Sequence, residues 1–342
     1  MTSAEAAQLL APAPACSHTV AGSGQAQLCA SCSRIERFKA QSRGQAGSII
    51  VSVFGDGILT RGGCVWLGSL IELLAPLGLS ERLVRTAVFR LAQDDWLEAV
   101  VQGRRSDYRL TPAGRRRFVQ ASGQIYASAS PPWDQRWRLI TVTAALEPSA
   151  RERLRRALFW HGFGELGGDC FVHPSADLAL VFESLQADGL APLLGRLLPL
   201  VAANPQLGES GKDADLVRRA WNLLDLDQAY RAFVDSYAPV LAQWQSHAGA
   251  MDEASAFLIR SLLIHDYRRL LLRDPQLPGV LLPAQWAGHE ARQLCRQLYG
   301  LLLAPSERHL NQKLRLADGQ TPLASALVGE RFGLHDPLTG SV

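Results

Sequence analysis

The stretch SERLVRTAVFRLAQ, residues 80–93, decides the fold of the N-terminal third of this 342-residue chain. Ser80 is a typical helix N-cap, and the apolar residues after it recur at helical spacing. The inward positions are Leu83, Val84, Ala87, Val88 and Leu91, and the outward positions are Arg82, Arg85, Thr86 and Arg90. The pattern predicts an amphipathic helix that presents arginines to solvent.

The segments around this helix follow a recognisable order. The patterning predicts helices at 47–59, 65–74 and 81–93, strands at 96–101 and 106–110, and a further helix after Thr111. The turn between the two strands carries Arg104 and Arg105. Two helices joined by a short turn, followed by a third helix and a two-stranded wing, indicate a winged helix-turn-helix.

The rest of the chain divides at two breaks rich in Ser, Pro, Gly and Asn, at 127–132 and 203–213. We expect an α+β protein with a winged helix-turn-helix, a ferredoxin-like middle domain and an all-α C-terminal domain. In the middle domain the patterns predict strands at 137–143, 170–173 and 178–182 and helices at 148–161 and 190–201. The expected domains are a disordered leader at 1–44, the winged helix domain at 45–127, the ferredoxin-like domain at 133–203 and a helical effector and dimerisation domain at 213–317.

Composition narrows the class of protein. Residues 34–119 hold 14 Lys/Arg against 8 Asp/Glu, whereas residues 120–342 hold 21 against 23, so the basic excess lies in this one segment. No apolar run approaches the roughly 20 residues that span a bilayer, and no charged leader of an export signal begins the chain. Six scattered cysteines imply no disulfide framework. We expect a cytoplasmic protein that is not bound to a membrane.

Several stretches in two regions of the chain, 54–110 and 262–299, resemble a known family. FGD at 54–56 followed by RGGCVWLGSL at 61–70, the helix at 80–91 and GRRSDYRL at 103–110 are similar to the phenylacetic acid catabolism repressors, the PaaX-like family. LLIHDYRR at 262–269, RDP at 273–275 and LCRQLY at 294–299 resemble its helical domain. The leader with Cys16, Cys29 and Cys32 departs from the family pattern.

This resemblance, which covers about residues 45–310, implies a homodimeric transcriptional repressor of aromatic-acid catabolic genes. The partners that it implies are double-stranded operator DNA and an aryl-coenzyme A thioester, typically phenylacetyl-coenzyme A, which releases the repressor. We expect base readout from the helix and phosphate contacts mainly from the wing. The predicted DNA-binding residues are Arg61, Ser80, Arg82, Arg85, Thr86, Arg90, Arg104, Arg105 and Tyr108.

A second candidate site, for the effector, is less clearly indicated by the sequence than the DNA-binding surface. His265, Arg268 and Arg269 could form an anion pocket for the phosphates of a coenzyme A thioester. The alternative, which we favour from the sequence, is a structural network between helices.

Other motifs have ordinary interpretations. Gly162-x-Gly164-x-x-Gly167 follows a predicted helix and precedes a strand, the reverse of a dinucleotide site. Cys16, His18, Cys29 and Cys32 could bind zinc, but their spacing is not a common finger pattern. We therefore predict no metal, no cofactor and no catalytic residue. The alternative function is a nucleic-acid-processing enzyme acting through the middle domain, although the sequence shows no convincing pair of acidic residues there.

Overall fold

The computed structural model describes residues 19–20, 27–127, 130–203, 212–246, 252–325, 328–329 and 331–333. Two compact units make up the fold. Unit 1 takes the described parts of residues 1–126, 233–268 and 292–342, and unit 2 takes those of 127–232 and 269–291. None of the helices in these described parts is long and apolar enough to cross a membrane.

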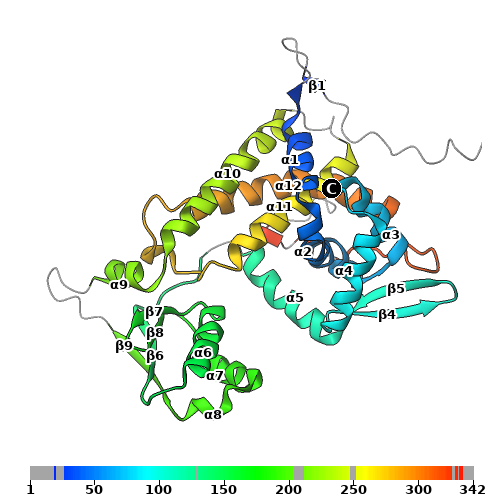
Figure 1. The fold of residues 1–342 in the computed structure, drawn as a ribbon. Helices are drawn as coiled ribbons and strands as arrows, with labels where there is room; N and C mark the ends of the chain where they lie inside the picture. The colour runs from blue at the N-terminus through cyan, green and yellow to red at the C-terminus, as the bar shows by residue number, and fades with distance from the viewer. Residues whose placement is uncertain are drawn as a thin grey trace, which may run out of the picture. The chain divides into compact units, whose positions relative to one another are not determined.

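Unit 1 joins the predicted DNA-binding segment to helices from the C-terminal half (Figure 1). Its N-terminal elements are β1 (Thr19–Val20), β2 (Gln27–Leu28), α1 (Ala30–Lys39), α2 (Ser42–Val53), β3 (Cys64–Trp66), α3 (Leu67–Leu74), α4 (Glu81–Gln93), β4 (Leu97–Gln102), β5 (Arg105–Leu110) and α5 (Pro112–Ile125). Short turns of helix occupy Phe54–Ile58, Leu59–Arg61 and Ala75–Leu77. The helix, helix, helix, hairpin, helix order expected between 47 and 125 is present.

Strands β3, β5 and β4 form an antiparallel sheet in that order. The β4–β5 hairpin pairs from Leu97 with Leu110 to Gln102 with Arg105, and it projects away from the helices in Figure 1. Gly103 at its tip has a φ of 61°, a conformation that glycine adopts without steric cost. The predicted wing is therefore a closed two-residue hairpin.

Helix α4 buries three of the five side chains that its sequence pattern places inward, and the other two, Leu83 and Leu91, are half-buried. Val84, Ala87 and Val88 are buried, and the Ser80 hydroxyl accepts a hydrogen bond from the Leu83 amide at 3.3 Å. The cap fixes where the helix begins, and the apolar face fixes how it is rotated.

The last part of α12 (Ala287–Lys313) shares the core of the N-terminal elements. The Ser69 hydroxyl donates to the Lys313 carbonyl at 2.9 Å, and the Trp66 amide donates to the Arg315 carbonyl at 3.0 Å. Phe54, Ile58, Leu302 and Leu310 are all essentially inaccessible to solvent. The N-terminal segment and this helix thus fold as one body.

The expectation of disorder before residue 45 is wrong for residues 30–44. Helix α1 spans most of this range, and it buries Cys32, Ile35 and Phe38 on one face. Its N-cap is Cys29, which is outside the usual set of Ser, Thr, Asp and Asn. The small polar residues between its apolar positions hid that face, and three of its partners, Gln243, Trp244 and Asp266, lie more than 200 residues away. Residues 1–18 and 21–26 lie outside the described residues.

Unit 2 contains the ferredoxin-like sheet that the sequence predicts. Strands and helices alternate as β6 (Arg136–Val142), α6 (Pro148–Trp160), β7 (Gly164–Gly167), β8 (Cys170–His173), α7 (Leu178–Leu185), α8 (Ala191–Leu194) and β9 (Leu197–Ala203). The strand order is β7-β8-β6-β9, and every neighbouring pair is antiparallel. Because Gly164 begins a strand that follows a helix, the glycines at 162–167 lack the strand-to-helix order of a nucleotide loop.

Alternate residues of β6 serve the two faces of this sheet. Ile140 packs with Leu154, Leu158 and Leu185 under α6 and α7. Trp137 packs on the other face with Val217 of α9 (Asp213–Ala220) and with Leu281. The sheet is therefore covered on both sides within unit 2.

Two element predictions in unit 2 are wrong. Residues 178–182 form the start of α7 and not a strand, because the Asp177 carboxylate caps the amides of Ala179 and Leu180. The helix predicted at 190–201 is present only at 191–194, as α8, and residues 197–201 belong to β9, an edge strand paired along β6. Short apolar runs fit both kinds of element, and the cap and the pairing partner decide between them.

The C-terminal region is helical, as expected. Helices α10 (Leu223–Ser246), α11 (Glu253–Leu271) and α12 make up most of it. Each contributes residues to both units.

Candidate nucleic-acid interface

The outward face of α4 is the candidate surface for DNA. Arg82, Arg85, Thr86 and Arg90 are all exposed, and so is Ser80 at the N-cap. These positions follow the i, i+3, i+4, i+8 spacing, so they share one side of the helix. Their opposite side is held by the buried apolar residues of α4, which fixes the direction in which the arginines point.

The contacts on this face are weak and exchangeable. The Arg85 guanidinium lies 2.7 Å from the Glu81 carboxylate, with about half of each side chain exposed. The Thr86 hydroxyl donates to the Arg82 carbonyl at 2.8 Å. Exposed ion pairs contribute little to stability, so Arg85 can leave Glu81 for a base or a phosphate at small cost.

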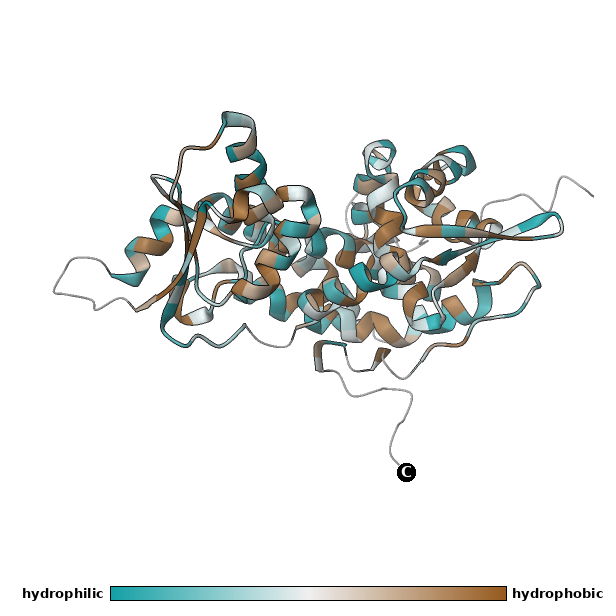
Figure 2. Ribbon diagram, turned by 90° about the horizontal axis from the view of Figure 1, so that it is seen from below, coloured by the Kyte–Doolittle hydropathy of each residue, from teal (hydrophilic) through white to brown (hydrophobic). Residues whose placement is uncertain are grey.

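The hairpin adds a second basic surface. Arg104 and Arg105 are exposed at its tip, and Figure 2 shows this tip as hydrophilic. The Arg105 guanidinium lies 4.7 Å from the centre of the Trp66 ring and donates to the Ala317 carbonyl at 3.1 Å. Arg105 is thus held against its own domain, which leaves Arg104 as the outermost cation of the turn.

Tyr108 lies in the middle of the three-stranded sheet. It is half-buried and pairs with Val65 of β3 and with Ala99 of β4. It therefore lies away from the hairpin tip, where the wing arginines are.

Arg61 does not lie on this surface, although the sequence included it among the DNA-binding residues. Its side chain is buried, and it donates to Glu307 at 2.5 Å, to Asn311 at 2.7 Å and to the Pro322 carbonyl at 2.8 Å. A buried guanidinium with these partners cannot reach a phosphate without breaking them. We therefore remove Arg61 from the set.

Phe89 is the residue that sequence reasoning missed. It is 59% exposed, although it is a large apolar side chain. It lies three residues after Thr86 and seven after Arg82, so helical spacing alone places it on the arginine face. The sequence did carry this signal, which the basic residues on either side obscured.

The candidate anion residues on α11 point into a network between helices. His265 is buried, with Nε2 3.0 Å from Gln45 Oε1 and Nδ1 3.4 Å from Ser52 Oγ. Arg268 donates to the Ser48 hydroxyl at 2.8 Å, whereas Arg269 is exposed. The geometry favours the structural network that joins α11 to α2 over an anion pocket.

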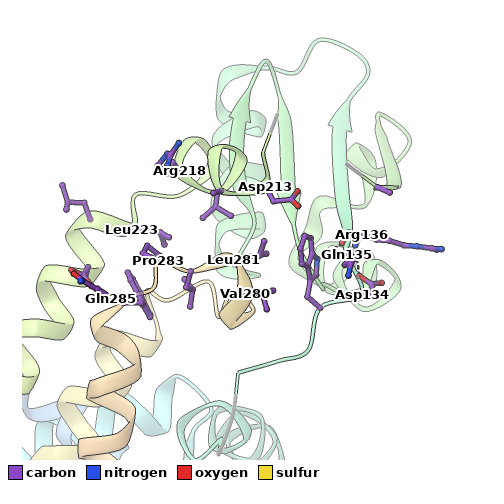
Figure 3. Close-up of a pocket in the computed structure, with 18 of the residues that line it drawn as sticks. Asp134, Gln135, Arg136, Asp213, Arg218, Leu223, Val280, Leu281, Pro283 and Gln285 are labelled. Atoms are coloured by element: carbon purple, nitrogen blue, oxygen red, sulfur yellow. Dashed lines mark hydrogen bonds between the residues drawn. The ribbon is translucent and has the colours of Figure 1, made fainter. Parts of the chain in front are cut away.

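Unit 2 holds a cavity of about 1150 Å³ beside the sheet (Figure 3). Trp133 and Trp286 supply aromatic surface, and apolar side chains come from residues 280–283. Three arginines and three carboxylates also line it, namely Arg136, Arg218, Arg231, Asp134, Asp213 and Asp227, and Arg231 pairs with Asp227 at 2.8 Å. The volume lies just above the usual range of small-molecule sites, and the aromatic and apolar surface suits an aryl group.

Three family models match the chain. The PaaX-like protein model matches residues 45–114, the PaaX protein central Cas2-like domain matches 130–194, and the PaaX-like protein C-terminal domain matches 221–312. Transcriptional repressor PaaX from Escherichia coli (strain K12) is 37% identical over 289 residues, which cover 84% of this chain and 89% of that protein. The chain belongs to the PaaX-like family. The matched PaaX-like ranges include the whole of α4 and of the β4–β5 hairpin.

A solved structure is also similar to this PaaX-like chain. It is the uncharacterized protein Rv0674 from Mycobacterium tuberculosis, with 23% identity and a TM-score of 0.45. The match covers 70% of this chain and 88% of that one.

Proposed function

We propose that this protein is a DNA-binding transcriptional repressor that uses residues 45–127 as a winged helix-turn-helix. The observation that carries the proposal is the arginine face of α4 beside an arginine-tipped hairpin. The name of the Escherichia coli relative, transcriptional repressor PaaX, supports regulation as the activity and argues against an enzyme.

In this proposal α4 enters the major groove. Arg82, Arg85 and Arg90 can reach base edges, because a guanidinium donates two parallel hydrogen bonds to guanine. Arg104 at the hairpin tip meets phosphate, which positions the protein without reading sequence. One such domain covers a short half-site, so we propose a homodimer on a two-fold operator.

The regulated genes and the effector follow from the family resemblance. We propose that the protein acts in the cytoplasm on genes of aromatic-acid catabolism. We also propose that an aryl-coenzyme A thioester such as phenylacetyl-coenzyme A releases the protein from DNA. Tenfold release requires that the effector prefer the non-binding state by about 1.4 kcal/mol.

The cavity of unit 2 is the effector site that we propose in place of His265, Arg268 and Arg269. Trp133 and Trp286 can stack on an aryl group, and the nearby arginines can meet the phosphates of coenzyme A. His265 and Arg268 are held by Gln45, Ser48 and Ser52 instead, and Arg269 is exposed.

Gel-shift titration tests the proposal. The full-length protein is titrated against promoter DNA of aromatic-acid catabolic genes from its own genome and against a shuffled duplex, at two salt concentrations. We expect preference for the promoter, weaker binding at high salt because counterions compete for phosphates, and release by phenylacetyl-coenzyme A but not by coenzyme A. Equal affinity for both duplexes would contradict the proposed repressor function. Preference for the promoter without release by phenylacetyl-coenzyme A would contradict only the proposed effector.

A further inference from the structure

The corner between α1 and α2 carries a group of cations. Between residues 35 and 55 the only acidic residue is Glu36, whereas Arg37, Lys39 and Arg43 are basic. Arg37 and Arg43 are exposed, and Lys39 is half-buried. This corner, residues 37–43, precedes the range that the PaaX-like protein model matches, which begins at residue 45. Its charge is therefore a feature of this chain that the matched range does not include.

The corner packs against the start of α4. The Ser42 hydroxyl donates to the Gly78 carbonyl at 3.5 Å, two residues before the N-cap Ser80. Gly78 has a φ of 75°, and a Cβ there would lie only 3.2 Å from Lys39 Cγ. The stem of Lys39 thus covers this turn, while its ammonium pairs with Glu36 at 2.6 Å in an exposed contact. The corner is held at the N-terminal end of the helix that carries the arginine face.

Arg43 projects from the side of α2 that faces away from α11. Gln45 of α2 contacts His265 of α11 at 3.0 Å. Arg43 precedes Gln45 by two residues, a rotation of about 200° at 3.6 residues per turn, so the two side chains leave α2 on opposite sides. Within the described parts of the chain, no carboxylate forms an ion pair with Arg43. Its charge can therefore be used by a ligand.

The place of this corner beside α4 selects the ligand. A helix in the major groove lies close to a phosphate backbone on each side, because the groove, about 12 Å wide, is hardly wider than a helix with its side chains. Cations on the elements that flank such a helix are placed to meet phosphates. The hairpin with Arg104 follows the C-terminal end of α4, and the corner packs at its N-terminal end.

We propose that Lys39 and Arg43 form a second phosphate-binding surface, which contacts the backbone of duplex DNA at the N-terminal end of α4. This surface depends on the proposed repressor function, because it requires that α4 lie in the groove. Phosphates are the same for every sequence, so the surface adds affinity and no sequence preference.

Gel shifts with Arg43→Ala and Lys39→Gln in the full-length protein test this surface, with operator and shuffled duplexes at several salt concentrations. Lys39→Gln removes the charge and keeps most of the stem that packs on Gly78. Each substitution should weaken binding to both duplexes about fivefold, keep the preference for the operator and reduce the salt dependence by about one ion. Charge reversal in Arg43→Glu should weaken both by roughly tenfold or more. Melting temperatures should stay at the wild-type value.

Arg37→Ala is the matched control for charge. Arg37 is exposed in the same corner, but it precedes Lys39 by two residues and so lies on the opposite side of α1. Its loss should change neither affinity nor salt dependence, and a loss equal to that of Arg43→Ala would contradict the assigned surface. If wild type prefers the operator and Arg43→Ala binds as wild type does, the second surface is wrong and the repressor function stands. Wild-type protein without that preference would overturn both.

Ethylation interference on the operator locates the contact. Phosphates whose ethylation blocks wild-type binding should form two groups in each half-site. Arg43→Ala should lose its sensitivity to one group and Arg104→Ala to the other. Loss of sensitivity at the same phosphates in both variants would contradict a surface separate from the hairpin.

Discussion

Asp56 and Arg260 form a buried ion pair within unit 1, with Asp56 Oδ2 2.7 Å from Arg260 Nε and at most 5% of either side chain exposed. Arg331 also contacts the Asp56 carboxylate at 2.8 Å, and Arg260 reaches Glu307 at 2.6 Å. Glu307 in turn holds Arg61. These charged side chains thus form one continuous network that joins the segment between α2 and β3 to helices α11 and α12.

The hydroxyls of Tyr126 and Tyr299 complete this network. Both donate to Asp56 Oδ1, at 2.6 and 2.9 Å. Burial alone would raise the pKa of the Asp56 carboxyl, but Arg260, Arg331 and the two tyrosine hydroxyls lower it below its ordinary value. The carboxylate is therefore ionised in the folded protein at neutral pH.

Asp56→Asn should destabilise the protein by about 3 kcal/mol or more, because it leaves Arg260 and Arg331 short of a buried counter-charge. Urea unfolding at pH 7 measures the change. Glu98→Gln is the matched control, since Glu98 pairs with Arg109 in an exposed cross-strand contact and its loss should change little. Equal effects of the two substitutions would mean that the buried network does not hold unit 1 together.

The same pair predicts an acid dependence. Because folding lowers the pKa of Asp56, its contribution is complete above the unfolded value of about 4 and disappears as the pH falls through the folded value. The stability difference between wild type and Asp56→Asn should therefore be constant from pH 7 to 5 and shrink below about pH 4. Urea titrations at pH 7, 5, 4 and 3 would show this, and a difference that is unchanged at pH 3 would contradict it.

Arg268→Ala and Val280→Trp should separate the two candidate effector sites. Val280 lines the cavity of unit 2 and is 79% exposed, so tryptophan there should obstruct ligand without disturbing the core. We expect calorimetry to show at least tenfold weaker binding of phenylacetyl-coenzyme A by Val280→Trp. Arg268→Ala should instead lower the melting temperature and leave ligand affinity unchanged. If Arg268→Ala weakens ligand binding and Val280→Trp does not, the effector binds at α11 and not in the cavity. Leu180→Trp, at an exposed position outside the cavity, is the control for added bulk.

Phe89→Ala should weaken operator binding by about tenfold without a loss of stability. An exposed phenylalanine on the arginine face can contact a thymine methyl group or exclude water beside it. Val119→Ala removes a similarly exposed apolar side chain from α5, 60% accessible against 59%, and should leave DNA affinity unchanged. Gel shifts measure the operator affinity of both variants, and melting curves check that both are folded. A loss shared by both variants would point to a general effect of surface hydrophobicity.

Local patterns predicted much of the fold and of the candidate surface. The cap and apolar face of α4 fixed its rotation, and the period of two placed β4, β5 and β6. Where the sequence failed, the deciding contact was distant, except at 178–182, where the neighbouring Asp177 caps a helix. Arginine is usually a surface residue, but Arg61 is buried against Glu307, Asn311 and Pro322, which lie at least 246 positions away in the sequence. Residues 30–39 are helical because α10 and α11 cover them, and residues 197–203 are extended because β6 offers an edge.

The ratio of affinities for operator and shuffled duplex, measured for wild type, Arg85→Ala and Arg104→Ala, tests the central claim most directly. The claim is that α4 reads sequence while the hairpin holds phosphate. Arg85→Ala should lower the ratio about tenfold and leave binding to shuffled DNA nearly unchanged. Arg104→Ala should weaken binding to both duplexes and reduce the salt dependence by about one ion. If Arg85→Ala keeps the wild-type ratio, α4 is not the reading helix and the account is wrong.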